Sequence, residues 1–249
     1  MNVVARMTVT ALAEHGVPAL PAYRRALVRA CDESPPPFGK KKYARLYRDS
    51  ARDPEWVALS LATNAESEGD GAEHLWDMAA CTPGADVAAQ IKRHAIDEAR
   101  HSRGYVTLLG LVFPGSMDEE LRALLEALSP GYTQAMPLSA KKGSPYARPA
   151  TVDELVQMNI AEIRTRIHHL FQRPVLLGYC PAEHRGRIKR ILNSLLLDET
   201  RHIAYTARLI ERAAQETSVD QVIDLMHERV RDFNEITDHE IASRTLGTA

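Results

Sequence analysis

Cysteine, aromatic residues and long apolar runs are all scarce in this 249-residue chain. Its three cysteines, Cys31, Cys81 and Cys180, lie far apart and form no C-x-x-C pair. This argues against a disulfide scaffold or a cysteine-based metal site and predicts reduced thiols in the cytoplasm. No apolar run approaches the ~20 residues that span a bilayer, so we expect no membrane association. The start of the sequence also lacks the continuous apolar stretch of a signal peptide.

The chain also has no large excess of charge of either sign. Lysine and arginine number 31 against 33 aspartates and glutamates, which gives a formal net charge of −2. A balanced chain has no broad basic field, so we expect no nucleic-acid partner. The apolar fraction of 45% and the charged fraction of 26% are ordinary for a globular protein. We therefore expect a single domain over residues 1–249.

Helical periodicity dominates the sequence, and strand signals are weak, so the predicted fold class is all-α. Capping residues, prolines and glycines mark the ends of the segments. Residues 129–150 are rich in proline, glycine, serine and lysine and are predicted to form a long connection. The predicted helices cover residues 5–32 (with an interruption near Pro18 and Pro21), 53–80, 86–112, 118–128, 151–177, 182–215 and 219–245.

A repeated pentapeptide is the most informative feature. Residues 97–101 read D-E-A-R-H, and residues 198–202 read D-E-T-R-H. Residues three apart share a helix face, so each glutamate can lie beside the histidine of its own copy. At about 100° per residue, Glu98 with His101 and Glu199 with His202 fall on the apolar stripes of their helices. Buried carboxylates are costly unless they are paired or bind a metal, so we predict a metal site.

Each of the two remaining long helices offers a further carboxylate. Glu68 lies near the middle of the apolar stripe of residues 53–80 and precedes Glu98 by 30 residues. Glu162 is the only carboxylate in the middle of residues 151–177, although it lies beside the stripe of that helix. A local helical irregularity could rotate it inward. His169, 30 residues before Glu199, is the competing candidate on this helix.

This set of residues resembles the ferritin-like di-iron carboxylate oxygenase superfamily, in which two Glu-x-x-His helices and two further glutamates surround a metal pair. The D-E-x-R-H form looks most like the hydroxylase subunits of bacterial multicomponent monooxygenases. The resemblance covers about residues 53–215. It implies a ferritin-like four-helix bundle with extra N- and C-terminal helices and a long crossover between two helical hairpins. The implied metal ligands are Glu68, Glu98, His101, Glu162, Glu199 and His202.

Residues that flank the repeat also have counterparts in this superfamily. The resemblance implies that Asp97 and Asp198 hydrogen-bond ligand histidines and fix their orientation, while Arg100 and Arg201 pair with such carboxylates. An ordinary surface ion pair is the alternative for both arginines. His94 extends the first copy to H-x-x-x-E-x-x-H, which is similar to a run in arylamine N-oxygenases, where it lies on the later helix. His94 is therefore either a further ligand or a packed core residue.

The function implied by this resemblance is that of a non-haem di-iron monooxygenase. Two iron ions, or a manganese–iron pair with the same ligands, would use O2 to oxidise a small organic substrate by C–H hydroxylation or amine N-oxygenation. Electrons would come from a ferredoxin or a flavin reductase, because the sequence has no flavin or iron–sulfur motif. The resemblance also makes a homodimer plausible. A ferroxidase or iron-storage protein and a non-catalytic helical scaffold are the alternatives.

Overall fold

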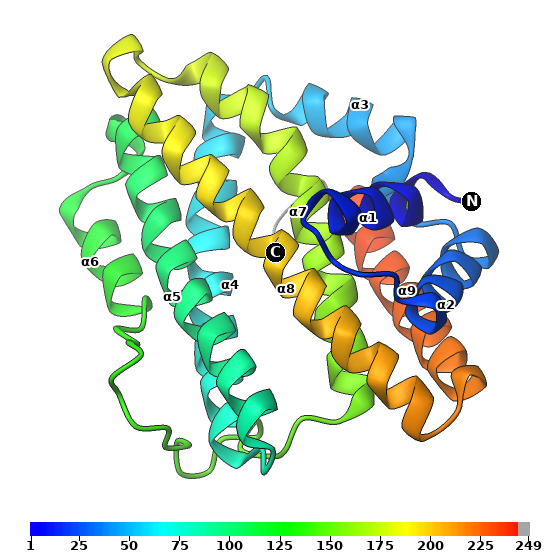
Figure 1. Cartoon of the computed structure of the whole chain (residues 1–249). Helices are drawn as coiled ribbons and strands as arrows, with labels where there is room; N and C mark the ends of the chain where they lie inside the picture. The colour runs from blue at the N-terminus through cyan, green and yellow to red at the C-terminus, as the bar shows by residue number, and fades with distance from the viewer. Residues whose placement is uncertain (244–249) are drawn as a thin grey trace. The chain divides into compact units, whose positions relative to one another are not determined.

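The computed structural model describes residues 1–243, and within this range the regular secondary structure is entirely helical (Figure 1). The prediction of an all-α fold is confirmed. The helices are α1 (Val3–Glu14), α2 (Pro21–Glu33), η1 (Pro37–Gly39), α3 (Lys41–Ser50), α4 (Pro54–Cys81), α5 (Ala85–Val112), η2 (Pro114–Ser116), α6 (Glu119–Ala127), α7 (Val152–Tyr179), η3 (Ala182–His184), α8 (Arg185–Glu216) and α9 (Val219–Ser243).

The helix boundaries follow local signals in the sequence. The predicted leading helix is interrupted as expected: α1 ends before Gly16, whose φ is +73°, and α2 starts with Pro21 at its first position. The side chain of Asp53 caps α4 by accepting a hydrogen bond from the Glu55 amide at 2.9 Å. Residues 244 and 245, at the end of the last predicted helix, lie outside the described part.

Helix α7 begins with the predicted capping box. The Thr151 amide donates to Glu154 Oε2 at 2.8 Å, and the Glu154 amide donates to Thr151 Oγ1 at 3.2 Å. The helix then continues through Pro174 to Tyr179. A proline inside a helix removes one backbone hydrogen bond and usually bends or ends the helix. Here the helix continues past the proline and ends at Tyr179, two residues beyond the predicted end at residue 177.

The chain separates into two compact units, each assembled from segments that are distant in sequence. Unit 1 contains residues 1–49, residues 151–172 and the described residues from Leu196 on. Unit 2 contains residues 50–150 and 173–195. Helices α7 and α8 therefore each contribute to both units. The expectation of a single domain stays a prediction.

In unit 2, helices α4 and α5 run side by side along most of their length (Figure 1). Both bury the apolar stripes that the periodicity predicts, including Leu61, Ala65 and Ala72 on α4 and Ile91 and Leu108 on α5. Small residues are frequent on the α4 stripe, which allows a close approach between the two helices. The pair forms a stable frame for polar side chains placed on the same stripes.

The connection between α6 and α7 is fastened to this frame, although residues 129–150 contain no helix. The Lys92 ammonium donates to the carbonyls of Gln134 at 2.9 Å and Met136 at 2.6 Å. The rings of Trp76 and Tyr132 stack with their centroids 4.2 Å apart. Side chains of α4 and α5 therefore satisfy two backbone carbonyls of this long segment and stack on Tyr132, which fastens it without secondary structure of its own.

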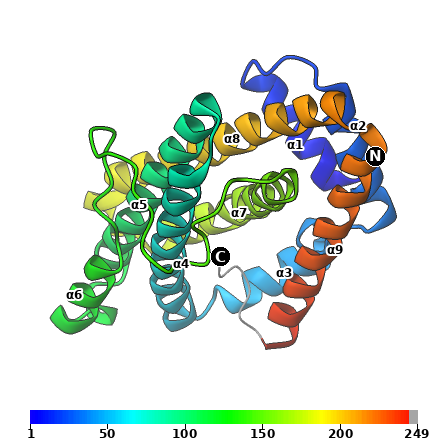
Figure 2. The same cartoon turned by 90° about the horizontal axis from the view of Figure 1, so that it is seen from below.

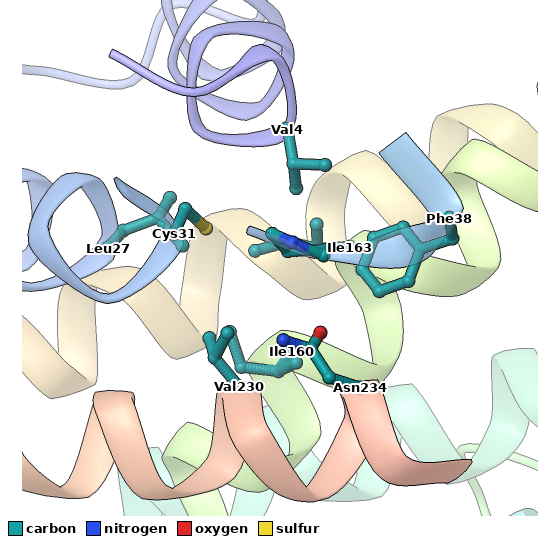
Figure 3. Close-up of a pocket in the computed structure, with 9 residues that line it drawn as sticks. Val4, Leu27, Cys31, Phe38, Ile160, Ile163, Val230 and Asn234 are labelled. Atoms are coloured by element: carbon teal, nitrogen blue, oxygen red, sulfur yellow. The ribbon is translucent and has the colours of Figure 1, made fainter. Parts of the chain in front are cut away.

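In unit 1, helices α2 and α9 lie side by side (Figure 2). Val4, Phe38, Ile160, Ile163 and Val230 close around a narrow apolar crevice that leaves no room for a water molecule (Figure 3). Burial, with a smaller contribution from Asp32, raises the pKa of the Cys31 thiol at its edge to about 12. The crevice is therefore part of a dry core, and Cys31 is an unreactive thiol within it.

Within residues 1–243, no helix combines the length and the apolar character that crossing a membrane requires.

Candidate functional site

Unit 2 contains a buried group of two glutamates and two histidines, which we call the α4–α5 cluster: Glu68 from α4 and His94, Glu98 and His101 from α5. His101 Nδ1 lies 3.3 Å from Glu98 Oε2 and 3.6 Å from Glu68 Oε2. His94 Nε2 lies 2.8 Å from Glu98 Oε1. The two carboxylates thus face one imidazole nitrogen from two different helices.

The orientation of α4 follows its apolar stripe. Glu68 is buried at 6% exposure, whereas Glu66 and Glu73 on the same helix are exposed. This is the side-chain placement that the periodicity predicts for the three glutamates of this helix. Glu68 is consequently the one that α4 brings to the motif of α5.

Unit 1 contains a second group of the same composition, the α7–α8 cluster: Glu162 and His169 from α7 and Glu199 and His202 from α8. His202 Nδ1 lies 3.3 Å from Glu162 Oε2 and 3.6 Å from Glu199 Oε2. His169 Nδ1 lies 3.9 Å from Glu199 Oε1. Glu162, beside its stripe, keeps 12% of its side chain exposed, while the other three residues are buried.

The two clusters have the same internal arrangement. In each, Nδ1 of the motif histidine faces the motif glutamate of its own helix and a second glutamate from the neighbouring helix. In each, the second oxygen of the motif glutamate faces an additional histidine. That histidine is on the motif helix in one case and on the neighbouring helix in the other. The two copies of the pentapeptide therefore make the same kinds of contact in the structure.

Electrostatics in the α4–α5 cluster favours a cation. Burial raises the pKa of Glu68 well above its ordinary value, and repulsion from the Glu98 carboxylate raises it further, while His101 partly offsets both effects. Within the described residues, Glu68 Oε1 is a buried oxygen without a hydrogen-bond partner. An acceptor of this kind is costly unless a proton or a metal ion occupies it.

The donor atoms of both clusters suit iron or manganese. Carboxylate and imidazole groups bind Fe(II) and Mn(II), and their ligand atoms in each cluster are already close together. Neither cluster includes one of the three free cysteines, and those thiols would be the preferred ligands of a structural zinc site. Each cluster therefore brings together carboxylate and imidazole groups of the kind that bind these ions.

The flanking residues of the repeat pair within their own copies. The Arg100 guanidinium donates to Asp97 and also to Ser194 Oγ at 2.8 Å, and the Arg201 guanidinium donates to Asp198 Oδ1 at 2.8 Å. Asp198 is 1% exposed, so Arg201 supplies a positive charge to a buried carboxylate. These pairs fit both the expected partnership of arginine with the motif aspartate and the alternative of an ordinary surface ion pair, because the Arg100 and Arg201 side chains are 42% and 54% exposed. The expected hydrogen bonds from the aspartates to ligand histidines stay predictions.

A close contact of α6 supports the α4–α5 cluster from outside. Ser102, next to His101, donates to the Ala65 carbonyl at 2.6 Å and lies 2.6 Å from Ser129 Oγ. At Gly69, next to Glu68, a Cβ atom would lie only 2.2 Å from the carbonyl oxygen of Leu128. The end of α6 is thus seated against the turns of α4 and α5 that carry the cluster.

A buried polar chain supports the α7–α8 cluster in a similar way. The Tyr23 hydroxyl donates to Asn159 Oδ1 at 3.0 Å, and Asn159 Nδ2 donates to Thr206 Oγ1 at 2.8 Å. The Thr206 hydroxyl in turn donates to the His202 carbonyl at 2.7 Å. Because Asn159 lies one turn before Glu162, this chain sets the register of α7 against α8.

The sequence does not identify the partners of these supporting residues. Asn159 and Ser102 can be recognised as polar residues on apolar helix faces, but their partners are 47 and 27 residues away. His168, which carried no pattern, is buried and lies 2.8 Å from the Tyr43 hydroxyl. Burial, followed by repulsion from Arg164 and His169, holds the pKa of His168 well below its usual range.

Comparison of the chain with models of protein families, with curated proteins and with solved structures finds no match to any of them.

Proposed function

We propose that this protein is a non-haem di-iron oxygenase of the ferritin-like kind that oxidises a small organic substrate with O2. The observation that carries the proposal is the repeated arrangement of two carboxylates around one histidine nitrogen in each cluster. In the superfamily that the sequence resembles, such a doubled set holds a pair of metal ions. The proposed ligands are Glu68, Glu98, His101, Glu162, Glu199 and His202.

A metal pair of this kind supplies the redox chemistry of O2 activation when it is bound. The chain supplies the ligands and their orientation. Glu68 Oε1 offers a carboxylate oxygen without a competing hydrogen bond. His94 and His169 each lie against the outer oxygen of a motif glutamate, where they hold its orientation or add a ligand.

The surroundings of the proposed ligands are apolar. Leu61, Ala65 and Ala72 are fully buried on the stripe that carries Glu68, and Ile160 and Ile163 are buried on α7 next to Glu162. Apolar walls exclude water from reactive oxygen chemistry and strengthen electrostatic contacts inside. They also favour an apolar or aromatic substrate. C–H hydroxylation and amine N-oxygenation are both compatible with such walls.

Metal loading of variants tests the ligand assignment. We expect Glu98→Ala and Glu199→Ala to abolish iron binding while circular dichroism shows an unchanged helical fold. Glu66→Ala, on the exposed face of α4, is the matched control and should load iron as the wild type does. Full iron occupancy in both cluster variants would contradict the assignment.

Oxygen consumption tests the reaction. With iron loaded and an electron supply present, an oxygenase consumes O2 in proportion to an added amine or aromatic substrate and yields an oxygenated product. A ferroxidase consumes O2 in proportion to added Fe(II), irrespective of organic substrate. O2 uptake that depends only on Fe(II) would replace the oxygenase assignment by the ferroxidase one.

A further inference from the structure

Four arginines of unit 2 form one basic face on two neighbouring helices. Arg100 and Arg103 belong to α5, and Arg187 and Arg190 belong to the first turns of α8. Arg103, Arg187 and Arg190 are exposed, and the Arg100 side chain is 42% exposed. We refer to these four residues as the basic face.

Two contacts bring these helices together. Arg100 donates to Ser194 Oγ at 2.8 Å, and a Cβ atom on Gly104 would lie 3.6 Å from a methyl group of Ile191. Arg187, Arg190 and Ser194 are spaced by three and four residues, so they share the side of α8 that meets α5. The arginines of both helices therefore border the same line of contact.

Acidic residues are scarce in the sequence around these arginines. The sequence contains no acidic residue between Glu98 and Asp118, or between Glu183 and Asp198. Asp97 is the nearby carboxylate on α5, and it already pairs with Arg100. The start of α8 also carries the positive end of the helix dipole, where acidic residues are favoured and arginines are not. Local stability does not account for this arrangement, but recognition of an anionic partner does.

The basic face lies directly over a proposed metal ligand. Arg100 and Arg103 flank His101, whose side chain is fully buried on the opposite side of the same helix turn. A helix with its side chains is only about 10–12 Å across, so a partner on this face comes within one helix thickness of the α4–α5 cluster. A short distance between a bound partner and the cluster is what electron transfer requires.

We propose that the basic face is the docking surface for a small acidic protein that carries one electron at a time. The inference rests on the proposed function, which requires electrons from outside the chain. Each carrier loses one electron, and one bound ferric ion becomes ferrous, so two carriers are oxidised for each iron pair reduced. Four arginines on two adjoining helix turns make a compact face, which favours a small acidic protein over an extended nucleic acid or an anionic membrane.

Binding of a plant-type [2Fe–2S] ferredoxin, used as an acidic probe, tests the surface. We expect wild-type protein to bind it by calorimetry at low ionic strength and to release it as salt screens the charges. The double variant Arg187→Glu/Arg190→Glu should bind at least about tenfold more weakly. The control Lys41→Glu/Lys42→Glu reverses two exposed charges at the start of α3 and should leave binding unchanged. Arg100 and Arg103 are left intact because they flank His101.

The reduction rate of iron-loaded protein gives a second readout. In the arginine variant, reduction by ferredoxin should slow by a similar factor, whereas reduction by dithionite should keep its wild-type rate. Equal ferredoxin binding by wild type and variant, no binding by wild type, or stronger binding of single-stranded DNA or anionic vesicles to this face would overturn the inference. If wild type takes up no iron, the function assignment fails separately, and the binding comparison still decides what the basic face recognises.

Discussion

Replacement of Glu68 by glutamine should stabilise the metal-free protein while preventing metal binding. Glutamine has the size of glutamate but cannot ionise, so it removes both the cost of burying a charge and the repulsion from Glu98. A residue kept only for stability would behave in the opposite way, because its replacement would cost free energy of unfolding. The sign of the effect therefore distinguishes a binding role from a structural one.

The magnitude follows from proton linkage. Because the pKa of Glu68 is raised, the folded protein holds a proton at pH values where the unfolded chain has released it. The contribution of Glu68 to stability is therefore fully present below pH 4.5 and is lost as the pH rises toward the folded-state pKa. Each pH unit over which the folded protein keeps this proton while the unfolded chain releases it costs about 1.4 kcal/mol. For a chain of this size, relief of each 1 kcal/mol of that cost raises Tm by about 2–4 °C.

Thermal unfolding of the metal-free protein at about pH 7 and about pH 4 measures the effect. We expect Glu68→Gln to raise Tm at the higher pH and to leave it nearly unchanged at the lower pH, where wild-type Glu68 is neutral in both states. Glu66→Gln, on the exposed face of α4, should change Tm at neither pH. Destabilisation by Glu68→Gln at neutral pH, or an equal effect at both pH values, would refute the reasoning.

Three further predictions concern residues around the two clusters. Gly69→Ala forces the Leu128 carbonyl to move and should lower the free energy of unfolding by about 1–3 kcal/mol, with reduced iron occupancy. Thr206→Val removes the hydroxyl that accepts from Asn159 and should cost about 1–3 kcal/mol in urea unfolding. The depressed pKa of His168 keeps it neutral when folded, so its contribution to stability, present above pH 6.5, is lost as the pH falls below that value.

Each of these predictions has a matched control. Gly71→Ala lies in the same helix as Gly69, but a Cβ atom there meets nothing within 4 Å, so it should not destabilise the protein. Thr206→Ser keeps the hydroxyl and should recover most of the loss in urea. His168→Gln should flatten the loss of stability between about pH 6.5 and pH 5. An equal slope in wild type and His168→Gln would contradict the assigned neutral state.

Helix positions could be predicted from the sequence because periodicity and capping are local. The capping box at Thr151 and the cap at Asp53 mark the starts of α7 and α4 within a residue. Pro174 lies inside the predicted helix, and α7 continues through it as predicted. The contacts of residues 129–150 were not predictable, because they join residues far apart in the sequence, such as Lys92 and the carbonyls of Gln134 and Met136.

The residues of the two clusters could also be predicted, with one ambiguity. The stripe of α4 points to Glu68, and the structure buries it beside His101. On α7 the sequence left Glu162 and His169 in competition, because spacing from a turn gives the level along a helix but not the rotation about it. The structure brings Glu162 to His202 and His169 to Glu199, so both residues belong to the cluster. Their role as ligands stays a prediction.

Electron paramagnetic resonance of protein reconstituted with Fe(II) without oxygen and then oxidised tests the central claim most directly. We predict about two irons per chain and a coupled ferric pair that gives no ground-state signal, as the resemblance to di-iron carboxylate proteins implies. Glu98→Ala and Glu199→Ala should lack both the iron and the coupling. A signal of isolated ferric ions, a single bound zinc or no bound metal would contradict the account and leave a helical scaffold in its place.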